Sequence, residues 1–251
     1  MTIDEFQQHQ LIQEAFQDGV DIQNTLGLKL TDDLPEDTTL DELQFYIIRV
    51  GFATAHALGW VQQLHHAVHF MTEFKYGRKA DDAGVNKSHH LLYNVENYLI
   101  RMVSIYDRCL QLTNSVFHLC ISEELVNHGA VVSNLHVSRT DVPKLLKAVR
   151  KAIKDEEQER HKLIHRHSHI DPELRRIELF YMQSEAAWGS DHKVPFKSLV
   201  HMRGQLVKMY TSRRKAEFEA VNAELVNSMA PLFDGLLVEY RRQKVRLAKL
   251  V

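Results

Sequence analysis

The sequence is poor in the residues that make tight turns and covalent cross-links. Its 251 residues include only 10 glycines, 5 prolines and 2 cysteines. An all-β sandwich of this length usually needs more turn residues, so the shortage favours helices. Cys109 and Cys120 fall in one helical pattern, where eleven residues separate them by roughly 16 Å, too far for a disulfide within the chain. We therefore expect reduced cysteines, buried on an apolar stripe, in a cytoplasmic protein.

Long apolar runs and familiar cofactor motifs are also missing. No run approaches about 18 apolar residues, and the first ten residues are acidic and polar, so the sequence predicts neither a transmembrane helix nor a signal peptide. The glycine-rich motifs that bind nucleotide phosphates do not occur, and neither do GxSxG, HExxH or CxxC. We expect a protein with no cofactor, no resident metal and no membrane contact.

The small net charge of −2 conceals a strong asymmetry along the chain. Residues 1–45 carry 11 acidic residues and one basic residue, a net charge of −10, whereas the remainder carries +8. One interpretation is that the body binds an anionic ligand, which the acidic N-terminal arm mimics or repels. The other is that two oppositely charged faces pack against each other.

Helical periodicity runs through nearly the whole chain. We predict an all-α fold, an elongated up-and-down helical bundle that forms one domain over residues 1–251. Residues 1–38 form an N-terminal helix, over 3–25, and an acidic loop. A capping box of Thr39 and Glu42 starts a long helix. Further helices are predicted over 88–121, after Asp141, and over 171–188, where Asp171-Pro172 is a typical helix start. Another long helix begins at Pro195 and is interrupted by Pro231, and the last helix follows Pro231 to the C-terminus.

The most informative stretch lies between the helix after Asp141 and the Asp171-Pro172 start. Residues 155–169 read DEEQERHKLIHRHSH, which combines arginines with histidines near a helix end. Arginine binds phosphate bidentately, and imidazole titrates near neutral pH. These are the groups needed to cleave RNA without a metal. An imidazole takes the proton of the ribose 2′-OH, a protonated group helps the 5′-oxygen to leave, and arginine stabilises the charge on phosphorus.

The order Arg160-His161-x-x-x-His165 resembles the R-x(4–6)-H signature of HEPN domains, in which a polar residue usually follows the arginine. The resemblance covers about residues 88–190, with further helices added at both ends. It implies a helical bundle that dimerises, so that two motifs form one cleft. Many members are metal-independent ribonucleases of toxin–antitoxin, phage-defence or RNA-processing systems, and others are inert modules that bind a nucleotide or a protein. His161 stands where asparagine is frequent, a substitution that keeps a polar side chain but changes its hydrogen bonds.

The resemblance assigns roles to this motif. Arg160 binds the scissile phosphate, His165 is the general acid/base and His161 positions one of them. His167, seven residues after Arg160 and therefore on its helical face, is the reserve catalytic base. The expected partners are RNA, a second copy of the chain and an antitoxin or other protein partner. The lysines and arginine expected to bind RNA are Lys151, Lys154, Lys162 and Arg166.

Two alternatives stay open at this stage. The chain is an inert HEPN-like protein that binds a nucleotide or protein partner, or its histidines at i, i+4 spacing, such as His65 and His69, hold a metal. Arg49 and His56 also match the looser motif spacing, but they lie within a predicted core helix, and we interpret that pair as accidental. In a straight helix, Arg160 and His165 differ by about 140° and 7.5 Å. They share a phosphate only if the helix ends or bends between them, or if a second subunit completes the site.

Overall fold

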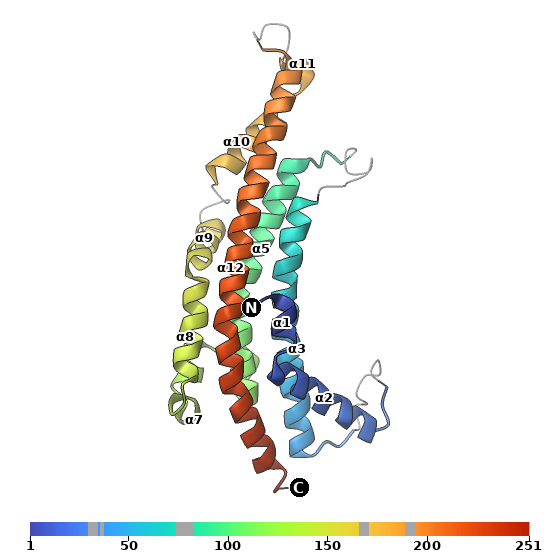
Figure 1. Ribbon diagram of the computed structural model, residues 1–251, viewed down its shortest axis with the longest axis vertical. Coiled ribbons are helices and arrows are strands. Elements are labelled where there is room, and N and C mark those ends of the chain that lie inside the picture. The colour runs from blue at the N-terminus through green and yellow to red at the C-terminus, as the bar shows by residue number, and fades with distance from the viewer. Residues whose placement is uncertain (30–34, 36–37, 74–82, 166–170, 189–193, 251) are drawn as a thin grey trace. The chain divides into compact units, whose positions relative to one another are not determined.

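The computed structural model confirms the all-α prediction (Figure 1). It describes residues 1–29, 35, 38–73, 83–165, 171–188 and 194–250; for residues 160–165 and 187 it describes the backbone alone. Within this described part, 81% of the residues are helical and no strand occurs. No helix among the described residues is both long and apolar enough to cross a membrane.

Long helices carry the fold, and short ones connect them. The elements are α1 (Ile3–Gln7), α2 (Gln10–Thr25), α3 (Glu42–Thr72), α5 (Lys87–Val116), the 3-10 turn η1 (Glu123–Leu125), α6 (His128–Val132), α7 (Leu135–Ser138), α8 (Val142–Ala152), α9 (Lys154–His165), α10 (Pro172–Tyr181), α11 (Glu185–Trp188) and α12 (Phe196–Leu247). The chain divides into two compact units: residues 1–62, 104–153 and 223–251 form unit 1, and residues 63–103 and 154–222 form unit 2.

The core of unit 1 joins three long helices through Tyr46. Its ring is fully buried and stacks on Tyr240 of α12, with 5.8 Å between ring centroids. Its hydroxyl donates a 2.9 Å hydrogen bond to the carbonyl of Val116, at the end of α5. Burial raises the pKa of this hydroxyl, so it remains a donor at any ordinary pH. One aromatic side chain on α3 therefore links α5 and α12.

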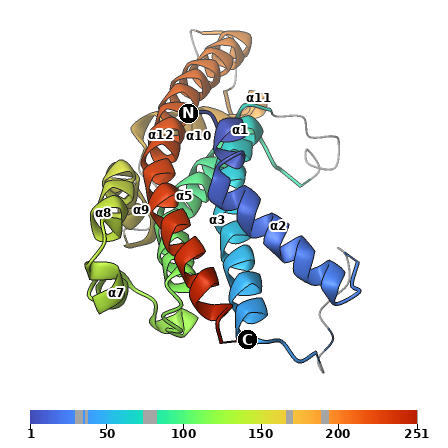
Figure 2. The ribbon, with the colours of Figure 1, turned by 60° about the horizontal axis from the view of Figure 1, so that its bottom comes forward.

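The acidic N-terminal helices pack onto the basic end of α12. Phe6 of α1 contacts Phe233, with 4.8 Å between ring centroids. From α2, Glu14 pairs with Arg241 and Asp18 pairs with Lys244. Figure 2 shows α2 crossing beside the first part of α3 in the same unit. The contacts support the second interpretation of the charge asymmetry, in which oppositely charged faces pack together.

Unit 2 is held by a second buried aromatic pair. The ring of Tyr98 on α5 stacks on Phe218 of α12 at 3.7 Å and an interplanar angle of 12°. The Tyr98 hydroxyl donates to the side-chain oxygen of Asn222 at 2.9 Å. The imidazole Nε2 of His90, near the start of α5, lies 2.8 Å from the carbonyl of Phe70 at the end of α3. These contacts set α3, α5 and α12 against one another within the unit.

Helix boundaries differ from the sequence prediction where local signals compete. The capping box at the start of α3 is Asp41 with Gln44, in which each side chain accepts from the backbone N–H of the other. The predicted Thr39–Glu42 box is wrong, because the same pattern recurs two residues later. The predicted helix 3–25 is two helices, since the His9 side chain caps α2 by accepting from the N–H of Leu11. The predicted helix 171–188 is likewise divided, into α10 and α11.

The end of α5 corrects the prediction for one cysteine. The helix was predicted to reach residue 121 but ends at Val116, and His118 and Cys120 then adopt positive φ angles of 52° and 56°. These left-handed residues stop the helix. Cys109 lies in α5 and is buried as predicted, whereas Cys120 lies beyond the helix and is exposed. Neither cysteine forms a disulfide.

Pro231 lies inside α12, which continues unbroken to Leu247, so the predicted break there is wrong. Proline has no N–H, so the carbonyl of Asn227 cannot accept its usual helical bond. The helix continues because Leu232, Phe233 and Leu236, on the following turn, are fully buried. Packing in the core therefore outweighs the local cost of proline.

Replacing Pro231 with alanine is expected to stabilise the protein. Proline costs about 3 kcal/mol relative to alanine in a helix interior, and the rigidity that it gives the unfolded chain offsets about 1 kcal/mol of this. Pro231 is exposed, so the change opens no cavity. Urea unfolding should give a free energy higher by about 1–2 kcal/mol. Glu224→Ala, at another exposed position of α12, is the control and should change the free energy little. An unchanged or lower value for Pro231→Ala would contradict this account.

Candidate functional site

The predicted motif lies on α9. Arg160, His161, Lys162 and His165 all belong to α9, for which the structure describes the helical backbone at these positions. The described part of α9 runs from Lys154 to His165. His167 and Arg166 lie outside the described residues. Because α9 is helical from Arg160 through His165, the helix does not end between the two positions.

One buried arginine forms hydrogen bonds with residues on both sides of this motif. Arg214 of α12 is only 9% exposed. Its Nη2 donates to Glu159, directly before the motif, at 2.6 Å, and to Asp171, six residues after His165, at 3.0 Å. The stretch that carries the predicted catalytic groups therefore begins and ends at carboxylates bound to the same guanidinium.

Further charged groups complete the network around Arg214. Glu217 accepts from Arg214 Nη1 at 3.3 Å and from Arg213 Nη1 at 2.9 Å. Arg213 also donates to Glu173 on α10 at 3.0 Å. The side chain of Arg213 is 42% exposed, against 11% for Arg214. Arg214 is thus the buried centre of the network and Arg213 its solvent-facing edge.

Aromatic rings shield the Arg214 guanidinium from water. It lies 5.9 Å from the ring centroid of Tyr210 and 5.6 Å from that of Phe218, one turn before and one turn after it on α12. Such contacts stabilise a cation that has lost part of its hydration. Burial would lower the pKa of Arg214, but its hydrogen bond to Glu159 and the neighbouring Tyr210 raise it overall. The guanidinium is therefore permanently charged.

Asp171 combines two roles in this network. Its Oδ1 accepts from the N–H groups of Glu173 and Leu174, which caps α10 as the sequence predicted. Its Oδ2 binds Arg214. Burial alone would raise the pKa of Asp171, but Arg214 and the two backbone N–H groups lower it overall. The carboxylate is consequently ionised at neutral pH.

The predicted RNA-binding lysines that the structure describes are exposed. Lys151 lies in the last turn of α8 in unit 1, and Lys154 is the first residue of α9 in unit 2. Both side chains are available to solvent, as contacts to phosphate require.

Several histidines of the described residues serve local structure. His9 caps α2 and its Nε2 lies 3.1 Å from Asp234, His118 Nε2 lies 2.7 Å from Glu42, and His201 pairs with Gln205. Burial lowers the pKa of His90, which contacts the Phe70 carbonyl. Among the described residues, no three His, Cys, Asp or Glu side chains gather as a metal site would require.

Sequence reasoning missed Arg214. It lies in the run Arg213-Arg214-Lys215, a pattern that is typical of a solvated helix face. A usable signal was nonetheless present, because Tyr210, Arg214 and Phe218 recur every four residues and so share one helical face. An arginine on an aromatic stripe indicates a buried cation that needs carboxylate partners.

Removing the Arg214 side chain should destabilise the protein strongly. Arg214→Ala removes the nearer of two cations from the buried Asp171 carboxylate, since Arg213 lies 3.6 Å from it and Arg214 3.0 Å, and such a loss typically costs about 3–5 kcal/mol. Arg213→Ala is the matched control, because the same side chain is lost from the exposed neighbouring position. It should cost less than about 1 kcal/mol. Urea unfolding at pH 7 measures both variants. Equal effects of the two substitutions would contradict the central role of Arg214.

The charge of Asp171 should make stability depend on pH. Its pKa is lowered in the folded protein, so its contribution is present above the unfolded value of about 3.9 and is lost as pH falls through the folded value. Asp171→Asn keeps a capping side chain but removes the charge. The variant should be less stable than the parent at pH 7, and the difference should shrink below about pH 4. A difference in unfolding free energy that stays constant from pH 7 to pH 3 would contradict this assignment.

Comparison with known proteins agrees with this architecture. A family model described as Cthe2314-like HEPN matches residues 38–222, which includes α3, α5, α9, α10 and the first half of α12. No curated protein and no solved structure matches the chain at the significance required. The match covers well over half of the chain and contains the Arg160–His165 motif together with Arg214 and its carboxylate partners. The chain therefore belongs to the HEPN family.

Proposed function

We propose that this protein is a metal-independent endoribonuclease that cleaves single-stranded RNA by attack of the ribose 2′-OH. The observation that carries the proposal is the placement of Arg160-His161-x-x-x-His165 on the last turns of α9, in a chain of the HEPN family. Many members of the HEPN family are ribonucleases, and the residue types of the motif provide the groups that such chemistry uses.

The proposed reaction divides its work between three positions. Arg160 binds the scissile phosphate and stabilises the charge that builds on its oxygens. His165 exchanges protons with the 2′-OH or the leaving 5′-oxygen, and His161 orients one of these groups. The attacking oxygen displaces the 5′-oxygen, which leaves as a hydroxyl, and phosphorus retains a cyclic bond to the 2′- and 3′-oxygens. Attack by the 2′-OH restricts the substrate to RNA.

Arg214 supports this proposal as a positioning residue. It holds Glu159 before the motif and Asp171 after it, and both bonds are buried or half-buried. Preorganised catalytic groups need such a fixed frame, because small displacements cost much of the rate. Lys151 and Lys154 are exposed and supply positive charge for the phosphates of the flanking RNA.

We further propose that the active species is a homodimer in which each site is completed across the two-fold axis. The positions of Arg160 and His165 differ by about 140° around a regular helix and by about 7.5 Å along it. Because α9 includes both positions, one copy directs them to different sides. Two antiparallel copies of α9 place Arg160 of one copy opposite His165 of the other. An antitoxin or other protein that covers this cleft would silence the enzyme.

The purified protein is expected to cleave single-stranded RNA but not DNA, with and without EDTA. The products should carry a 2′,3′-cyclic phosphate and a 5′-hydroxyl. His165→Ala should lower the rate by about 10²–10⁴, the usual cost of losing a general acid/base. Arg160→Lys should also fail, because an ammonium group cannot reproduce the bidentate fork. His136→Ala and Arg176→Lys change the same residue types at exposed positions on α7 and α10 and serve as controls.

Mixing two inactive variants tests the dimer and the chemistry together. When Arg160→Ala and His165→Ala subunits are unfolded together and refolded, half of the dimers are mixed, and one of the two sites in each is intact. About a quarter of the parent activity should therefore return. No recovery would place both groups of a site in one subunit. Cleavage that is undiminished in every single variant would overturn the assignment. A parent protein that cleaves no RNA would favour the inert, partner-binding type of HEPN protein.

A further inference from the structure

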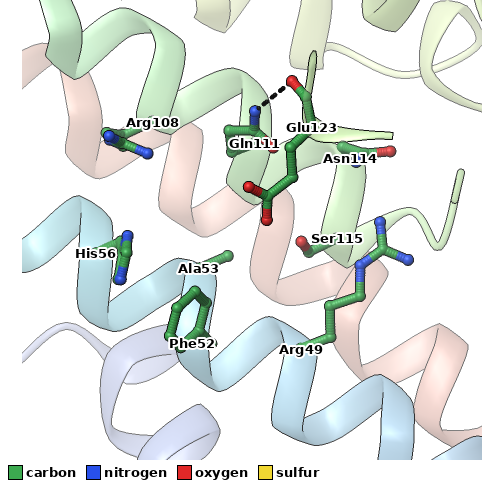
Figure 3. Close-up of a pocket in the computed structure, with 9 residues that line it drawn as sticks. All are labelled: Arg49, Phe52, Ala53, His56, Arg108, Gln111, Asn114, Ser115 and Glu123. Carbon is green, nitrogen blue, oxygen red and sulfur yellow. Dashed lines mark hydrogen bonds between the residues drawn. The ribbon is translucent and has the colours of Figure 1, made fainter. Parts of the chain in front are cut away.

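A second cluster of cations lines a small cavity in unit 1. The cavity lies between α3, α5 and η1 and has a volume of about 80 Å³. Figure 3 shows Arg49 and His56 projecting from α3 and Arg108 and Gln111 from α5, with Glu123 of η1 reaching in between. The sequence pattern had singled out Arg49 and His56 as an accidental pair, but the structure brings both to one cavity together with a second arginine.

The two arginines of this cavity have no carboxylate partners. Within the described part of the chain, neither Arg49 nor Arg108 forms an ion pair. Arg49 Nη1 lies 3.4 Å from the thiol of Cys120. The guanidinium carbon of Arg108 lies 5.1 Å from the ring centroid of Trp60, and its Nε is buried without a hydrogen-bond partner. A buried guanidinium nitrogen without an acceptor is costly, so a bound anion that accepted from it would be stabilising.

Glu123 occupies the centre of the cavity without satisfying these groups. Its backbone carbonyl accepts from Gln111 Nε2 at 3.1 Å, which holds η1 against α5. Its carboxylate points into the cavity, between His56 and Arg49 (Figure 3), yet forms no ion pair with either arginine. The carboxylate lies where the positive charges of the cavity attract negative charge. It would therefore repel an anion that binds to the same charges.

The volume of the cavity and the residues that line it limit the kind of ligand that it can bind. About 80 Å³ is far below the roughly 300 Å³ of a pocket for a drug-sized molecule, so the cavity encloses only a compact group. Two guanidiniums favour the doubly charged phosphate over a singly charged carboxylate, and their planar forks match its oxygens. At the edge, Phe52 is 60% exposed, and its ring centroid lies 4.2 Å from that of His56. The exposed ring offers a face on which the organic part of a phosphate ester can stack.

We infer that this cavity binds the phosphate group of a small molecule, held by Arg49, Arg108 and His56 and opposed by Glu123. This inference involves neither Arg160 nor His165, so it stands or falls independently of the proposed ribonuclease activity. The same phosphate chemistry has two sources, inorganic phosphate and a phosphate ester whose organic part rests on Phe52.

The first experiment titrates inorganic phosphate into the full-length chain. Arg108 lies over Trp60, so binding at this guanidinium should change the Trp60 fluorescence, and Trp188→Phe removes the second tryptophan of the chain. Arg49→Gln and Arg108→Gln should each weaken binding about tenfold or more, the loss expected for a charge-assisted hydrogen bond. Arg139→Gln, at an exposed position of unit 1, is the matched control and should leave the affinity unchanged.

Glu123→Gln gives the decisive result, because it should tighten phosphate binding by about three- to tenfold through loss of a like charge. Misfolding does not produce a gain in affinity. Circular dichroism of Arg49→Gln and Arg108→Gln checks that their losses are local. The inference is overturned if millimolar phosphate binds neither the parent nor Glu123→Gln, or if both arginine variants bind phosphate as the parent does.

A second titration identifies the source of the phosphate. Phenyl phosphate that binds more tightly than inorganic phosphate, with the advantage lost in Phe52→Ala, supports an organic phosphate ester. Equal affinities for the two probes support inorganic phosphate. Tighter binding of phenyl phosphate that is unaffected by Arg49→Gln and Arg108→Gln would show adsorption to Phe52 alone and would overturn the inference.

Discussion

The buried charge of Arg214 constrains the whole region around the HEPN motif. A guanidinium that is 9% exposed cannot rest in an apolar setting, so carboxylates from separate elements must meet it. Glu159 comes from α9, Asp171 from the start of α10 and Glu217 from α12 itself. The position of one side chain on α12 therefore fixes where α9 approaches its end and where α10 begins. Tyr210 and Phe218 exclude water from the same cluster, which strengthens each of its ionic contacts.

The two arginine clusters described above differ in whether their arginines are paired with carboxylates. In unit 2, Arg213 and Arg214 are paired with carboxylates, and such a network holds helices in place. In unit 1, Arg49 and Arg108 face a cavity without ion pairs within the described residues. Each cluster contains two arginines, so a count of positive charges does not distinguish the two clusters. What distinguishes them is whether the protein supplies the counter-charge or leaves it to a ligand.

Local signals in the sequence predicted most of the fold, and failures occurred where distant contacts decide. The Asp171-Pro172 start of α10 was correct because capping involves only neighbouring residues. Pro231 was wrongly expected to break α12, since burial of Phe233 and Leu236 is a tertiary effect. The Arg160–His165 pattern on α9 was read from residue order alone and stays a prediction. The role of Arg214 was not predicted, because its partners lie 55 and 43 residues away in the chain.

The helical state of α9 shapes what the proposed active site requires. Positions 161 and 165 are four apart and share one helical face, whereas position 160 lies about 100° away from position 161. Positions 161 and 165 thus share a face of α9 that suits a proton donor and a proton acceptor on the proposed reaction, and position 160 lies on another face. On that proposal, a phosphate held between two copies would receive imidazoles from one and a guanidinium from the other. On the proposed reaction, dimerisation is then part of the chemistry itself, because neither helix alone assembles the set of groups that cleavage needs.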